Sequence, residues 1–99
     1  MERLSEHAIQ EFTALRRDIH QHPELAFNEH RTSALVAEKL REWGYEVSTG
    51  IGGTGVVGQL RRGTSTRTLG IRADMDALPI VEDTGVAWSS SHHGVMHAC

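Results

Sequence analysis

The sequence predicts an α/β fold in which two N-terminal helices pack on a small mixed or antiparallel sheet. Apolar residues recur at helical spacing in the segment before Gly44, and the period changes to two after it. The connections between the later segments are short and rich in glycine, whereas parallel neighbours need a crossover of a dozen or more residues. We therefore expect two helices followed by a compact β unit.

The first helix is predicted to begin after Ser5, whose hydroxyl can cap the amides of the first turn. Its apolar stripe consists of Ala8, Phe12, Leu15 and Ile19. The helix should end before Pro23, which has no amide hydrogen and cannot continue the helix. We expect this stripe to face the core.

The second helix is predicted over about Glu29 to Trp43, with Asn28 as its N-cap. Gly44 follows the helix and can adopt the left-handed conformation common at such ends. The residues expected to point inward are Ala34, Val36, Leu40 and Trp43.

Strands are expected over about 46–50, 54–61 and 67–74, joined by glycine-rich turns. After Pro79 the composition turns to glutamate, aspartate, glycine, serine and histidine without a sustained period. This predicts a long loop, and loops of that length are usually functional or disordered.

The composition describes one soluble globular unit, with 99 residues, 38% hydrophobic residues and a net charge of −3. No basic stripe is present, so we expect no nucleic-acid partner. No apolar run approaches the ~18 residues of a membrane span, and the N-terminus lacks the apolar stretch of a secretion signal. We expect no membrane association and a cytoplasmic protein.

Residues 50–55 match the G-x-G-x-x-G pattern of dinucleotide-binding proteins. That motif requires its last glycine to open a helix whose amides face the pyrophosphate. Here β-branched Val56 and Val57 follow, and Gly58 interrupts the segment. We therefore interpret the pattern as a connection between strands.

Asp74 and Asp76 would share one face of an extended segment, with Cα atoms about 7 Å apart. Both could then serve one polar site. The alternative is that Asp74 pairs with Arg72 and that Asp76 caps the turn before Pro79.

Potential metal ligands gather near the C-terminal end, namely His92, His93, His97 and Cys99. Thiolate and imidazole suit zinc or another borderline divalent ion. Two alternatives stay open, a surface loop with spare histidines and a cysteine nucleophile. The remaining histidines, His7, His20, His22 and His30, are expected to be surface or packing residues.

Four segments in register carry a family resemblance, residues 18–25, 50–58, 71–79 and 94–99. Together they resemble the opening of the hippurate hydrolase and N-acyl-amino-acid amidohydrolase family of metallopeptidase-like enzymes, which includes indole-acetyl-amino-acid hydrolases. The resemblance covers nearly the whole chain, from about Leu15 to Cys99.

The resemblance implies that residues 1–99 are the N-terminal part of a catalytic domain, the start of a three-layer metallopeptidase-like fold. The rest of that domain and an inserted lid or dimerisation domain would lie outside this chain. The full-length protein would cleave small-molecule N-acyl amino acids, such as hippurate, to a carboxylate and a free amino acid. It would use two divalent ions, of manganese, zinc, nickel or cobalt, and is compatible with a homo-oligomer.

The same resemblance makes Cys99 a metal ligand and Asp76 a catalytic-site residue that orients a ligand. Asp74 stands where related metallopeptidases carry a histidine ligand, so its role stays open. Arg72 and His97 match recurring family residues without an assigned catalytic role. The chain alone is expected to be inactive, and the competing hypothesis is a short non-catalytic protein with an interaction role.

Overall fold

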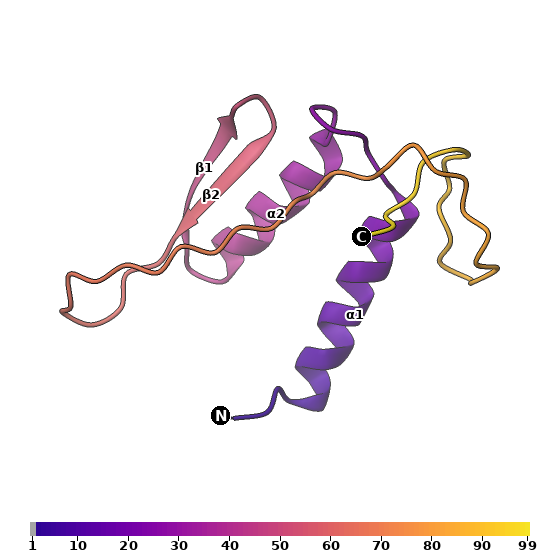
Figure 1. Ribbon diagram of the computed structural model, residues 1–99. Coiled ribbons are helices and arrows are strands. Elements are labelled where there is room, and N and C mark those ends of the chain that lie inside the picture. The colour runs from indigo at the N-terminus through magenta and orange to yellow at the C-terminus, as the bar shows by residue number, and fades with distance from the viewer. Residues whose placement is uncertain (1) are drawn as a thin grey trace.

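The computed structural model describes residues 2–99 and contains two helices and one hairpin (Figure 1). The elements are α1 (Glu6–Gln21), α2 (His30–Glu42), β1 (Glu46–Ile51) and β2 (Gly55–Gln59). The two strands form an antiparallel sheet. The predicted fold class, helices followed by a small antiparallel sheet, is confirmed. None of the helices within residues 2–99 has the length and apolar character needed to cross a membrane.

Helix α1 begins and ends as the sequence predicts. The Ser5 hydroxyl accepts a hydrogen bond from the Ala8 amide at 3.1 Å, and the helix stops two residues before Pro23. Its apolar stripe is less covered than expected, because no residue of α1 is fully buried. The Phe12 ring meets the Trp43 ring edge to face, with centroids 5.7 Å apart, yet 44% of Phe12 is exposed.

Helix α2 has a different N-terminal cap from the one predicted. The helix begins at His30, and the cap position falls on Glu29, whose side chain makes no capping bond. The Glu24 carboxylate accepts from the amides of Arg31 and Thr32 instead, at 3.0 and 2.6 Å. The prediction of Asn28 as N-cap is therefore wrong, because a carboxylate from the preceding loop satisfies the amides that a cap would bind.

The C-terminal end of α2 follows the prediction, since Gly44 has a φ of 88°. The chain then enters the hairpin, in which Glu46 pairs with Gln59 and Val47 with Gly58. Helix α2 packs on both strands. Gly58 lies beneath Leu40, and a Cβ at Gly58 would stand 3.0 Å from a Leu40 methyl carbon.

The glycine-rich segment is a strand connection, as the sequence indicates. Residues 52–54 form the turn, and Gly55 opens β2 rather than a helix. No helix N-terminus therefore follows these glycines, so the phosphate-binding geometry of a dinucleotide motif is lacking here.

The third predicted strand is wrong. Residues 60–76 bend at Gly63 and Thr64 and form no strand, and Leu69 and Ile71 are 83% and 88% exposed. The alternating sequence favours a strand, but a strand needs a hydrogen-bonded neighbour, and none lies beside this segment within residues 2–99.

Candidate metal centre

Two short backbone pairings bring the chemically important segments together. Ala77 donates its amide to the Glu24 carbonyl at 2.8 Å, next to a parallel bridge between Leu25 and Ala77. Leu78 and Met96 form an antiparallel bridge and exchange two hydrogen bonds, at 2.9 and 3.0 Å. In an antiparallel pair, the chain before one residue and the chain after its partner leave in the same direction. The bridge therefore sends Asp76 and Cys99 toward the same end.

A hollow of about 1140 Å³ opens between the helices, the hairpin and the C-terminal segment. Helix α1 contributes Ile19 and His20 to its wall, and α2 contributes Val36 and Leu40. The C-terminal segment contributes Met96, His97, Ala98 and Cys99. Cys99 lies at this wall as a free, exposed thiol.

The two aspartates do not share one environment. Arg72 donates to the Asp74 carboxylate at 2.9 Å, and this pair is solvent-exposed, with 70% of the Asp74 side chain accessible. The alternative that Asp74 pairs with Arg72 is thus the one observed. Asp76 is half-buried beside Ala77, which is fully buried.

His97 carries an unsatisfied polar atom. Its Nε2 is buried and has no hydrogen-bond partner within residues 2–99. Burial lowers the pKa of His97, the nearby His20 adds to this effect, and the carboxylates of Asp76 and Glu24 oppose it. A neutral imidazole is therefore favoured beside the hollow, which is the protonation state able to act as an acceptor or a ligand.

Residues 2–99 do not assemble a complete metal site. No three histidine, cysteine, aspartate or glutamate side chains of this part converge on one point. His92 and His93 are exposed, so for these two the alternative of spare loop histidines is the better description. These side chains fit a divalent ion only as part of a larger site, to which this part of the chain would contribute the Cys99 thiol.

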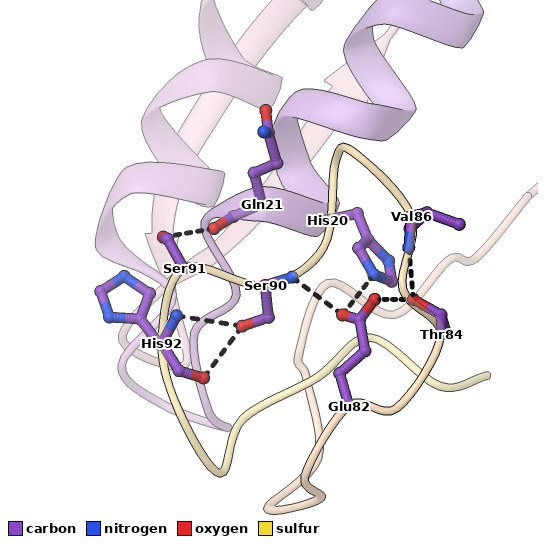
Figure 2. Close-up of polar contacts among 8 residues, drawn as sticks. All are labelled: His20, Gln21, Glu82, Thr84, Val86, Ser90, Ser91 and His92. Carbon is purple, nitrogen blue, oxygen red and sulfur yellow. Dashed lines mark hydrogen bonds and ion pairs between the residues drawn. The ribbon is translucent and has the colours of Figure 1, made fainter.

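Sequence reasoning missed a buried polar group, the Glu82 carboxylate (Figure 2). It accepts from His20 Nε2 and from the Ser90 amide, both at 2.8 Å, and from the Thr84 hydroxyl. We call these four residues the Glu82 cluster. The Thr84 hydroxyl, the Ser90 amide and His20, in that order, hold the pKa of Glu82 below its ordinary value although burial opposes them. No pattern of residue spacing could reveal the contact between His20 and Glu82, because the two residues are 62 positions apart.

Comparison with known proteins identifies several relatives, although no family model matches the chain. The chain is 54% identical to hippurate hydrolase of Campylobacter jejuni over 90% of its own length, but over only 23% of that protein. It is 51% identical to thermostable carboxypeptidase 1 of Saccharolobus solfataricus, covering 86% of the chain and 22% of the relative. N-acetyldiaminopimelate deacetylase of Bacillus cytotoxicus is 45% identical, with 92% and 24% covered.

A solved structure has the same backbone arrangement. It is the YXEP protein of Bacillus subtilis, described as a dinuclear metal binding peptidase from the M20 family. The TM-score is 0.85 at 37% identity, over 91% of this chain and 26% of that one. The chain thus spans about a quarter of the length of the relatives that it matches. In sequence and fold it matches the N-terminal part of the hippurate hydrolase and N-acyl-amino-acid amidohydrolase family of metallopeptidase-like enzymes.

Proposed function

We propose that residues 1–99 form the N-terminal part of the catalytic domain of a metal-dependent amidohydrolase. The proposed reaction cleaves the amide bond of an N-acyl amino acid to a carboxylate and a free amino acid. The observation that carries this proposal is the 54% identity to a hippurate hydrolase across 90% of the chain. The deacetylase among the relatives supports the same substrate class, an acyl group on an amino-acid nitrogen.

We assign Cys99 as a metal ligand and Asp76 as a supporting residue of the catalytic site. The thiol is exposed at the hollow, and a thiolate is a far better ligand than an alcohol for zinc and other borderline-soft divalent ions. Bound divalent ions supply Lewis acidity, which activates water and polarises an amide carbonyl. Asp76 lies two residues before the Leu78–Met96 bridge, on the end where Cys99 emerges.

The remaining ligands and the general base belong, in this proposal, to other parts of a longer protein that also carries an inserted lid or dimerisation domain. The support for this is the absence of three converging ligands within residues 2–99, since catalytic sites need three protein ligands or more. The role of this segment in the proposal is therefore to hold a thiolate and a carboxylate on the same side of the Leu78–Met96 bridge.

A cysteine substitution tests the proposed ligand. The experiment uses the complete protein encoded by the reading frame that contains this segment, and compares Cys99→Ser with Ala98→Ser. The control places the same hydroxyl one residue earlier, at another exposed position. We expect Cys99→Ser to lose bound metal and most hydrolysis of hippurate, while Ala98→Ser keeps both. Equal metal content and equal turnover in the two variants would exclude Cys99 as a ligand.

A second experiment tests the assignment of the remaining groups. Purified residues 1–99, supplied with manganese, zinc, nickel or cobalt, should not hydrolyse hippurate above the rate with the metal alone. Metal-dependent hydrolysis by this chain would mean that the site is already complete within it.

A further inference from the structure

We propose that Glu82, together with His20, is a positioning pair for the metal centre. The pair holds the loop of residues 79–95 on the C-terminal end of α1 and thereby keeps Cys99 beside the segment that carries Asp76. This inference rests on the proposed function for its metal readout, and on the observed contacts for its structural part.

Within the Glu82 cluster, the Glu82 and His20 side chains are shielded from solvent, whereas Thr84 is exposed. Only 6% of the Glu82 side chain and 16% of the His20 side chain are exposed. One carboxylate oxygen accepts from His20 Nε2 and the Ser90 amide, and the other accepts from the Thr84 hydroxyl (Figure 2). Hydrogen bonds to a charged acceptor are shorter and stronger than neutral ones. A carboxylate placed this far from solvent therefore depends on all three donors.

Two further contacts attach the same loop to the same turns of α1. Ser91 donates both its amide and its hydroxyl to the Gln21 carbonyl, at 3.0 and 2.6 Å. The Arg17 guanidinium lies over the Trp88 ring, 3.6 Å from its centroid. Long loops without regular structure are usually disordered or functional, and this one is fixed at several points along its length.

The fixed loop matters because both of its ends enter the candidate site. Leu78 precedes the loop and Met96 follows it, and these two residues form the antiparallel bridge. A loose loop would lower the population of that bridge, since closing a flexible loop costs entropy. Contacts with α1 restrict the loop and therefore lower the entropy lost when the bridge forms. His20 also approaches the ligand-bearing segment directly, with its ring centroid 6.5 Å from that of His97.

Glu82 therefore acts through other residues, because its three contacts are all to loop or helix groups. The test uses the complete protein encoded with this segment and compares Glu82→Gln with Asp83→Asn. Asp83 is the adjacent residue, it is exposed, and its substitution removes the same charge. A second pair compares His20→Ala with His20→Gln, because the glutamine amide can still donate to the carboxylate.

Three readouts are taken on each variant. Hydrogen exchange of peptides from residues 80–95 reports the loop, and peptides from α2 serve as the folding reference. Cobalt titration gives the metal affinity, and the thiolate-to-cobalt absorption band reports the geometry of Cys99. We expect Glu82→Gln and His20→Ala to speed loop exchange, weaken cobalt binding by roughly tenfold and alter the band, as for other residues that orient a ligand. Asp83→Asn and His20→Gln should stay near the parent protein.

Faster loop exchange with unchanged cobalt affinity would overturn the positioning role and leave only a structural one. Weaker cobalt binding without faster loop exchange would overturn the loop mechanism. Loss of α2 protection in both Glu82→Gln and His20→Ala would also overturn it, because the two residues would then support the whole fold rather than the loop. If the parent protein binds no cobalt, the proposed function fails, and with it the role toward a metal. Loop exchange would then still show separately whether the Glu82 cluster holds the loop.

Discussion

At the scale of single residues, Glu24 connects two parts of the fold that are distant in sequence. Its carboxylate accepts from the amides of Arg31 and Thr32 and from the Thr32 hydroxyl, and Thr32 is almost fully buried. Its backbone carbonyl accepts from Ala77, the neighbour of Asp76. One residue thus starts α2 and fixes the segment that leads into the candidate site.

This arrangement predicts a pH-dependent contribution from Glu24. Burial acts to raise the pKa of Glu24, but the hydrogen bonds from Arg31 and Thr32 together outweigh it, so the pKa is lowered. A lowered pKa in the folded state gives stability that is present above the unfolded value of 4.5 and is lost as the pH falls through the folded value. We expect Glu24→Gln to reduce the protection of the α2 amides by about 1 to 3 kcal/mol at neutral pH.

Amide hydrogen exchange followed by NMR measures this effect at Thr32 without assuming a global two-state transition. The matched control is Glu38→Gln, which makes the same change at an exposed position of α2. In acid the parent and Glu24→Gln should converge. A constant difference between them at all pH values would show that the charge of Glu24 contributes nothing.

At the scale of elements, the hairpin depends on backbone space at one glycine. A Cβ at Gly55 would lie 2.4 Å from the Ile51 carbonyl oxygen, which is far inside van der Waals contact. The obstacle is backbone of the paired strand and cannot rotate away as a side-chain tip could. Only glycine at position 55 therefore allows β1 and β2 to approach this closely.

Gly55→Ala should consequently disrupt the pairing of β1 with β2. We expect a loss of roughly 1 to 3 kcal/mol, the usual cost of forcing extra atoms into a packed position. Gly70→Ala is the control, because a Cβ there meets no atom within 4 Å and its φ is not positive. Exchange protection of those β1 and β2 amides that are hydrogen-bonded across the hairpin measures the effect, and equal protection in the two variants would contradict the steric argument.

The elements also show which features a sequence can predict. Signals confined to a few residues, such as the Ser5 cap, the stop before Pro23 and the Gly44 end of α2, were confirmed. Features that depend on residues distant in the sequence could not be predicted from it. The Glu24 cap of α2, the His20–Glu82 pair and the missing third strand are all decided by which segments meet in space. The assignments of Asp76 and Cys99 came from the family resemblance and stay predictions.

At the scale of the whole molecule, residues 2–99 form an open structure rather than a closed domain. The radius of gyration is 15.5 Å, whereas a compact domain of this length has about 13 Å. Among the apolar side chains of this part, only Pro23, Ala37 and Ala77 are buried. Apolar residues such as Ile19, Val36 and Leu40 line the hollow instead of forming a closed core.

The last prediction concerns purified residues 1–99 in solution. With so little apolar surface removed from water, urea unfolding should have a shallow slope, at or below about 1 kcal/mol/M, the lower limit for small proteins. The exposed apolar wall of the hollow should bind the dye ANS under native conditions. The Gly55→Ala variant should bind no less dye, because it opens the structure further. A steep cooperative transition without dye binding would show that this chain closes the hollow in solution, and that residues 1–99 are stable as a compact unit.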